Sequence, residues 1–281
     1  MNAIEIDRLS KNYDGFSLKE VSFSVPCGCV VGLIGENGAG KSTVINCVLG
    51  AVRPDGGNAK IFGQNAAAAD EKTRARVGVV TGSEGLPGNL TVRQIGKVLG
   101  GIFPKWEEKT FSAYMKKYAL PENKRFKELS NGMKQKVAVA AALSHGAELL
   151  VLDEPTVGLD PVARDELLDE LYNFMQSENH SVLISSHITG DLEKICDYIA
   201  FIHEGKLVFF EEKDRLGEKY GILKCRASAL GELAEDAVIS FFESPYGASA
   251  LVRRERLPRG MSAEKASIED IMLYYIRGRK I

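Results

Sequence analysis

The residues best suited to chemistry form a glycine-rich loop between an apolar run at 30–34 and a helix-like segment at 44–49. A triphosphate is densely charged, so its site needs backbone N–H groups turned inward and a helix N-terminus beneath them. The spacing G-x-x-x-x-G-K-S puts Lys41 within reach of the β and γ phosphates and the hydroxyl of Ser42 within reach of Mg²⁺. The loop therefore predicts a site for ATP or GTP. Its residues are Gly35, Glu36, Asn37, Gly38, Ala39, Gly40, Lys41, Ser42 and Thr43.

A second candidate motif lies downstream, where the apolar run 149–152 ends in Asp153 and Glu154. If this strand emerges beside the phosphate loop, Asp153 can hold Mg²⁺, which prefers hard oxygen ligands and keeps part of its water shell. Glu154 can then polarise an attacking water. The alternative is a pair of surface acids at a strand end, which the neighbouring phosphate loop disfavours.

Composition indicates a globular protein with a full core: of 281 residues, 44% are hydrophobic and 26% are charged. No apolar run approaches bilayer length, and the start has no basic region followed by an apolar one. We therefore expect a cytoplasmic protein that does not itself cross a membrane. A net charge of −2 argues against a nucleic-acid partner, and the arginines between 253 and 259 are interpreted as a solvated face.

The number of cysteines, five, is odd, and their spacing is not that of a disulfide framework. Both features fit a reducing compartment. Cys27 and Cys29 form a C-x-C pair, but no further Cys or His lies close in sequence to complete a tetrahedral metal site. We expect no metal there.

Hydrophobic periodicity predicts an α/β fold in several parts. Period-two alternation at 4–6, 21–25 and 59–63 predicts antiparallel strands. Lys- and Glu-rich helical segments follow from 90 to 129, with prolines at 104 and 121, and then a helix at 132–144. Short β-branched runs at 149–152, 181–185 and 198–202 predict a covered parallel sheet, with a hairpin at 204–205. After about residue 220 we expect a small α+β appendage ending in an amphipathic helix around 268–276.

Two further motifs make a family resemblance specific. One is Leu129-Ser130-Asn131-Gly132-Met133-Lys134-Gln135-Lys136, and the other is Leu152-Asp153-Glu154-Pro155-Thr156-Val157-Gly158-Leu159-Asp160. With the phosphate loop, they make residues 3–220 resemble the ATP-binding subunit of an ABC transporter. The contexts at 103–106 and 185–188 are most similar to bacterial ABC-2 type antibiotic and peptide exporters.

The resemblance implies a P-loop NTPase core with an antiparallel β subdomain, a helical subdomain and a C-terminal appendage. It implies an ATP-binding domain at 1–220, the helical subdomain at about 86–146, and the appendage at 221–281. In this family two nucleotide-binding domains, identical or paralogous, close head to tail around ATP and Mg²⁺. Ser130 and Gly132 are then expected to meet the γ-phosphate held by the partner, as a helix N-terminus can. Asn131 and Met133 depart from the family's usual glycine and glutamine.

The resemblance also assigns roles to single residues. Asp153 resembles the Mg²⁺ carboxylate, Glu154 the catalytic base, and His187 the switch histidine that contacts the γ-phosphate. Tyr13 resembles the aromatic that stacks on adenine, with core packing as the alternative. Asp160 resembles the aspartate that couples the two sites across the dimer.

One departure concerns the glutamine that the family places after the strand at 77–80, where it ligates Mg²⁺. This chain has Thr81-Gly82-Ser83-Glu84 instead, and glycine has no side chain to act as a ligand. Ser83, Glu84 or water is left to complete the metal shell.

These assignments predict an ATPase that powers a separate membrane-spanning permease, an exporter, from the inner face of the cell membrane. The permease is expected to dock on the helical subdomain around 86–120. One alternative is a soluble ABC ATPase acting on ribosomes or DNA, but such members carry two domains in one chain or long coiled-coil insertions. Another is a regulatory module that senses ATP, which Glu154 disfavours. An adjacent reading frame with about six apolar stretches of about 20 residues would favour transport.

Overall fold

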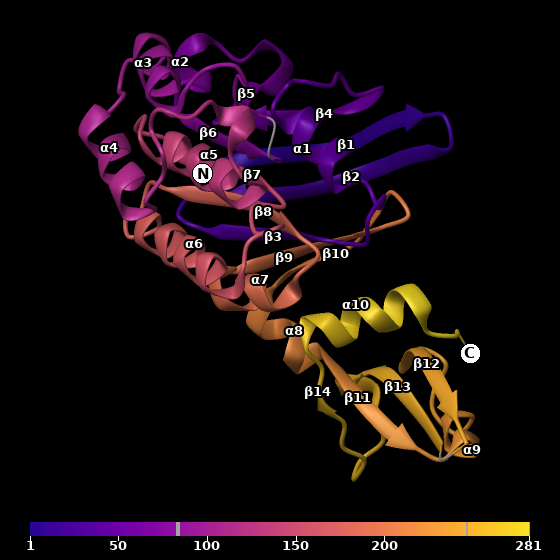
Figure 1. Ribbon diagram of the computed structural model, residues 1–281. Helices are drawn as coiled ribbons and strands as arrows, with labels where there is room; N and C mark the ends of the chain where they lie inside the picture. The colour runs from indigo at the N-terminus through magenta and orange to yellow at the C-terminus, as the bar shows by residue number, and fades with distance from the viewer. Residues whose placement is uncertain (83–84, 246, 281) are drawn as a thin grey trace.

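The computed structural model describes residues 1–82, 85–245 and 247–280, and a six-stranded sheet lies at its centre (Figure 1). The strand order is β10-β9-β3-β8-β7-β6, and neighbours are parallel except in the β9–β10 hairpin. The bounds are β3 (Val30–Ile34), β6 (Val77–Thr81), β7 (Leu149–Asp153), β8 (Ser181–Ser186), β9 (Tyr198–His203) and β10 (Lys206–Glu212). Every residue of β3 and β8 is buried, as expected for central parallel strands covered on both faces. The predicted parallel strands and hairpin are confirmed.

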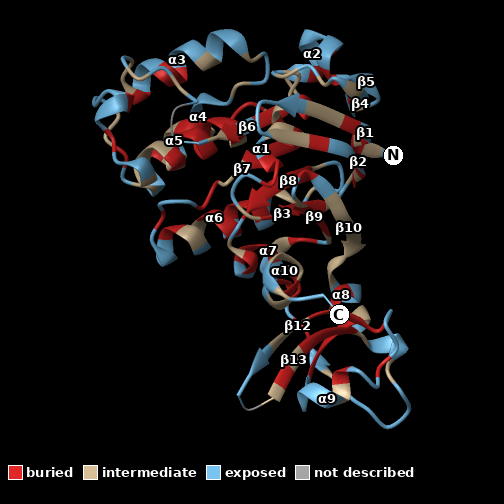
Figure 2. Ribbon diagram, turned by 90° about the vertical axis from the view of Figure 1, so that its right-hand side faces the viewer, coloured by how far each residue is buried: buried red, intermediate tan, exposed pale blue. Residues whose placement is uncertain are grey.

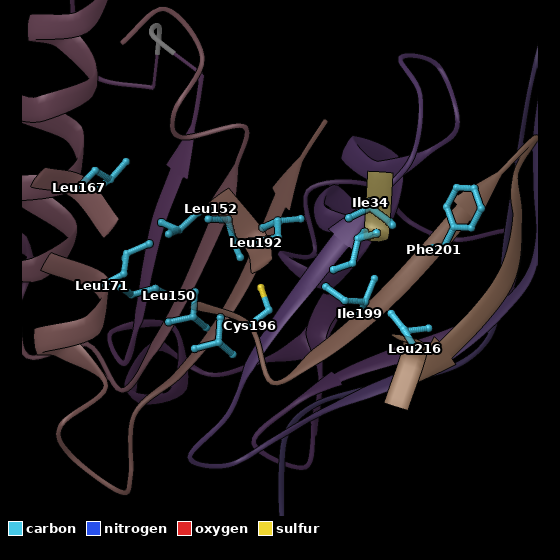
Figure 3. Packing of buried hydrophobic residues seen from close by; sticks show 14 of the residues in the cluster. Ile34, Leu150, Leu152, Leu167, Leu171, Leu192, Cys196, Ile199, Phe201 and Leu216 are labelled. Carbon is cyan, nitrogen blue, oxygen red and sulfur yellow. The ribbon is translucent and has the colours of Figure 1, made fainter. Parts of the chain in front are cut away.

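Two hydrophobic clusters cover the two faces of this sheet. Along β8, Val182 and Ile184 belong to one cluster and Leu183 to the other, because successive side chains of a strand point to opposite faces. Figure 3 shows the first cluster, in which Leu167 and Leu171 of one helix and Leu192 of another lie over the sheet. The helices that contribute to this cluster include α5 (Asn131–Leu143), α6 (Pro161–Phe174) and α7 (Thr189–Ile195). The opposite face packs against α1 (Lys41–Val48) and a second sheet.

The second sheet is antiparallel, in the order β2-β1-β4-β5. Its strands are β1 (Asn2–Tyr13), β2 (Phe16–Pro26), β4 (Gly56–Ile61) and β5 (Gln64–Asn65). The alternating sequence gives it one apolar face, which joins the cluster over α1. A 3₁₀ turn at Ala66–Ala68 and the short helix α2 (Glu71–Arg74) then lead into β6.

The segment between β6 and β7 is helical, as the sequence predicts. It contains α3 (Val92–Ile102), α4 (Glu108–Lys117), a 3₁₀ turn at Phe126–Glu128 and α5. Thr91 begins α3 with a capping box, its hydroxyl accepting from Gln94 N while the Gln94 side chain accepts from Thr91 N. Buried side chains of these elements, including Ile95 and Phe111, form a cluster of their own.

The C-terminal residues form a third sheet, antiparallel, in the order β12-β13-β11-β14 (Figure 1). Buried residues lie along its strand β13 (Figure 2). The elements that follow β10 are α8 (Lys213–Lys219), β11 (Tyr220–Cys225), α9 (Ala227–Leu230), β12 (Val238–Ser244), β13 (Gly247–Arg253), a 3₁₀ turn at Arg254–Arg256, β14 (Glu264–Lys265) and α10 (Ile268–Arg277). The predicted amphipathic helix is α10, which contacts α7 as well as β12 and β13. Ile222 and Ile271 join the cluster that contains Phe201 of the central sheet, so the third sheet and the core share buried surface. Among the helices of the described residues, none is both long and apolar enough to cross a membrane.

Candidate nucleotide-binding site

The phosphate loop lies between β3 and α1, at the carboxyl edge of the central sheet. Gly40 precedes α1 at φ +114°, and a β-carbon there would lie 2.9 Å from Cζ of Phe16, so a larger residue would strain the backbone and crowd this ring. No side chain caps the start of α1. The first N–H groups of this helix are therefore free to face an anion, and the helix dipole favours negative charge at the same point.

Lys41 is buried inside the loop, with a relative exposure of only 5%. Its Nζ donates to the carbonyl oxygens of Gly35 (2.8 Å) and Glu36 (3.3 Å) and lies 3.3 Å from Oε1 of Glu154. The Glu36 carboxylate is in turn 3.0 Å from Nδ1 of His203, at the end of β9. The Lys41 ammonium thus has three oxygen neighbours, two carbonyls and one carboxylate. A phosphate oxygen can replace one of them or be added to them.

The two carboxylates stand where β7 ends, beside β8. Asp153 pairs with Ser185 in the parallel register, and the Ser185 hydroxyl donates to Asp153 Oδ1 at 2.5 Å. The N–H of Glu154 donates to Oγ of the same serine (2.9 Å) and to its carbonyl (3.2 Å). Glu154 has φ +51°, a left-handed conformation that is uncommon for a residue with a side chain. Both hydrogen bonds join the Glu154 peptide to β8.

Glu154 lies between two basic side chains. Oε1 faces Lys41, while Oε2 is 2.8 Å from Nδ1 of His187 and accepts from the His187 backbone N–H at 3.3 Å. The structure therefore brings together three residues that are widely separated in sequence. A carboxylate oriented from both sides in this way can accept a proton from a water molecule.

Hard oxygen donors for a metal come from two elements. Ser42, the second residue of α1, is exposed, and Asp153 is half-buried at the end of β7. Hydroxyl and carboxylate oxygens fit Mg²⁺, which binds few protein groups and takes its other ligands from water and phosphate. Among the described residues, no group of three or more His, Cys, Asp or Glu side chains is arranged to hold a metal ion.

The serine and aspartate expected to act across a dimer both cap helices. Ser130 begins α5, its hydroxyl accepting from Met133 N at 3.3 Å, and Asp160 begins α6, its carboxylate accepting from Val162 N and Ala163 N at 3.0 Å each. The hydrogen bond from Ala163 is the largest cause that lowers the pKa of Asp160. A β-carbon on Gly132 would lie 3.4 Å from Leu159, so the two helix starts are neighbours on one exposed surface.

Tyr13 is at the end of β1 and is 45% exposed. Its ring is therefore not packed in the hydrophobic core. It stacks at 6.5 Å on Phe16 and lines a surface hollow together with Asn37 and Gly38 of the phosphate loop. An aromatic face beside the loop can receive a base. At the position of the family's glutamine, Gly82 follows β6, and Ser83 and Glu84 lie outside the described residues.

Comparisons with known proteins agree with this geometry. The model of the ABC transporter family matches residues 18–157. Over 209 residues the chain is 33% identical to the bacitracin transport ATP-binding protein BcrA of Bacillus licheniformis, covering 73% of this chain and 68% of that protein. The chain belongs to the ABC transporter ATP-binding proteins. It is therefore an ATP-binding ATPase of the P-loop fold, as predicted.

Two further relatives support the same placement. The Nod factor export ATP-binding protein I of Burkholderia orbicola is 35% identical over 211 residues, which cover 73% of this ABC protein and 69% of that relative. A solved structure of an ATP-binding subunit of an ABC transporter is 28% identical, with a TM-score of 0.70, and covers 77% of this chain and 92% of its own.

Two polar contacts at the site were missed by sequence reasoning, those of Ser185 and His203. The signal for Ser185 was a pair of serines at the end of an apolar strand that directly precedes His187. His203 is the last residue of β9. Its pairing with Glu36 depends on β9 lying beside β3 in the sheet, and the sequence motifs do not predict that strand order.

Proposed function

We propose that this ABC protein is the ATP-hydrolysing subunit of an exporter and drives a separate membrane-spanning permease from the cytoplasmic face of the membrane. The ATPase part of this proposal rests on the position of Glu154 between Lys41 and His187. The transport part rests on relatives named for bacitracin transport and Nod factor export.

We infer a role for each site residue. The N–H groups of the phosphate loop and the Lys41 ammonium bind the β and γ phosphates. Ser42 and Asp153 would hold Mg²⁺, which neutralises charge on the phosphates when bound. Glu154 takes the proton of the attacking water, and His187 keeps the carboxylate facing that water. Tyr13 stacks on the adenine ring.

A second nucleotide-binding domain, identical or paralogous, completes each site. Ser130 and Gly132 lie at the exposed start of α5, whose helix dipole can face the γ-phosphate held by the partner. Asp160 lies on the same surface, flanked by the exposed apolar residues Val157 (48%) and Val162 (69%). Apolar side chains beside polar ligand-binding groups are typical of a surface that becomes buried on association. ATP would then hold the two domains together.

We propose a domain boundary at residue 220, where the first strand of the third sheet begins. Residues 1–220 are the ATP-binding domain, with the helical subdomain at about 86–146, and 221–281 are the appendage. Val98 (45% exposed) and Ile102 (60% exposed) of α3 present an apolar surface on the helical subdomain, and we place the permease contact there.

Light scattering with gel filtration tests the two-domain site. Glu154→Gln should bind ATP without hydrolysing it and form an ATP-dependent dimer, with itself or with a paralogous partner. Adding Ser130→Arg should abolish that dimer, because an arginine does not fit against a bound γ-phosphate. A monomer under every condition, alone and with the paralogue, would contradict the two-domain site. Absence of Mg²⁺-dependent phosphate release by the unaltered protein would contradict the ATPase.

A further inference from the structure

Ser185 connects the two carboxylates of the site through a single hydroxyl group. It lies in β8, opposite Asp153 in the parallel register, and has a relative exposure of 0%. Its Oγ donates to Asp153 Oδ1 (2.5 Å) and accepts from the N–H of Glu154 (2.9 Å). A buried hydroxyl must find such partners, and here both belong to the site.

The first of these bonds fixes the rotamer of Asp153. Because Oδ1 accepts from the serine, Oδ2 is the carboxylate oxygen that remains for a metal ion. A carboxylate oriented before it meets its ligand loses less freedom on binding, and partners that orient ligands in this way commonly change metal affinity or activity by about 10–100-fold when removed.

The second bond acts on the backbone of Glu154. This residue has φ +51°, and such a conformation persists only where surrounding groups hold it. The Ser185 hydroxyl and carbonyl share the Glu154 N–H. Rotation of this peptide would move the Glu154 carboxylate away from Lys41 and His187. Ser185 therefore also affects the position of the proposed base.

We propose that Ser185 is a positioning residue for ATP hydrolysis, which holds Asp153 in the rotamer for Mg²⁺ and Glu154 in the backbone conformation for the base. The proposal rests on the roles proposed above for these two carboxylates. Its distinguishing feature is that one hydroxyl acts on both, so its removal reduces metal-dependent binding and the rate of hydrolysis together.

The same strand offers a matched control. Ser181 is also fully buried, lies on the same face of β8 four residues earlier, and accepts a hydrogen bond from Gly28 N at 3.1 Å. Replacement of either serine by alanine removes a buried hydroxyl from this strand. Only Ser185 is bonded to the carboxylates, so a general loss of packing or stability would affect both variants alike.

The experiment compares Ser185→Ala, Ser185→Thr and Ser181→Ala in the full chain. Affinity for a non-hydrolysable ATP analogue is measured by calorimetry with Mg²⁺ and with EDTA, and hydrolysis is measured by phosphate release. For Ser185→Ala we expect the affinity gain from Mg²⁺ to fall about 10-fold or more and kcat to fall about 10–100-fold, with affinity in EDTA within about twofold of the unaltered protein. Ser185→Thr, which keeps the hydroxyl, should recover most of both. Should Ser185→Ala not fold, Ser185→Cys replaces it, because a thiol is of similar size but a weak hydrogen-bonding group.

Asp153→Asn and Glu154→Gln are measured alongside, so that the two proposals fail in different ways. If these variants hydrolyse ATP normally, the assigned roles of the carboxylates are wrong. If they are impaired while Ser185→Ala, or its cysteine replacement, matches Ser181→Ala in both readouts, the carboxylate roles stand and the proposal for Ser185 is overturned. A threonine variant as impaired as alanine also counts against it.

Discussion

Replacement of Glu154 by glutamine should strengthen ATP binding while it removes hydrolysis. In the structure Oε1 of Glu154 is 3.3 Å from Lys41 Nζ, and the two side chains are 22% and 6% exposed. At this separation two unit charges attract by about 5 kcal/mol at an effective dielectric constant of about 20. A phosphate must compete with this attraction for the ammonium, and it is also repelled by the carboxylate.

Most of that energy does not appear in the binding constant. Lys41 keeps its bonds to Gly35 and Glu36, and the desolvation of two buried charges offsets much of their attraction. If about 1 kcal/mol remains, ATP affinity rises about fivefold. The hydrolysis rate should fall by about 10² to 10⁴, because the group that we propose accepts the proton from water is lost.

The assay is titration with ATP by calorimetry, together with single-turnover phosphate release. Glu148→Gln is the matched control, since Glu148 precedes the same strand at its opposite end, is 26% exposed and pairs with Arg76 at 2.6 Å. It should leave both ATP affinity and hydrolysis unchanged. If ATP affinity instead falls in Glu154→Gln, the carboxylate does not compete with phosphate for Lys41. Hydrolysis within about threefold of the unaltered rate would remove Glu154 as the base.

Three other predictions concern stability. The Ala163 N–H holds the pKa of Asp160 below its ordinary value of 3.8, so this carboxylate stabilises the fold above that pH and loses the effect as the pH falls through its lowered pKa. Asp160→Ala should therefore lower the unfolding midpoint at pH 7 but not at strongly acidic pH; an equal loss at both would contradict the charge effect. Tyr114→Phe removes a 3.0 Å hydrogen bond to buried Glu170 and should lower the unfolding free energy by about 1 kcal/mol in urea, and an unchanged value would contradict this. Deletion of 221–281 exposes the buried surface shared with the core, so the thermal midpoint should fall, and an unchanged midpoint would show that the core is independent.

The sequence by itself determined the parts of the site that are local along the chain. A phosphate loop is a backbone conformation, and its glycines, Lys41 and the following helix occur within nine consecutive residues. Strand and helix patterns likewise depend on near neighbours, so the alternating strands, the covered parallel strands and α10 were all predictable. The family followed from motifs whose order along the chain is itself part of the signal.

Only the tertiary structure decided which oxygen atom meets which donor. That His187 bonds one oxygen of Glu154 while Lys41 faces the other depends on β3, β7 and β8 ending at one edge of the sheet. The contact of Ser185 with Asp153 needs an adjacent parallel strand in one register, since a shift by one residue would turn the hydroxyl to the opposite face. The burial shared between the appendage and the core has the same origin, because an apolar pattern indicates that a face is covered but not which distant element covers it.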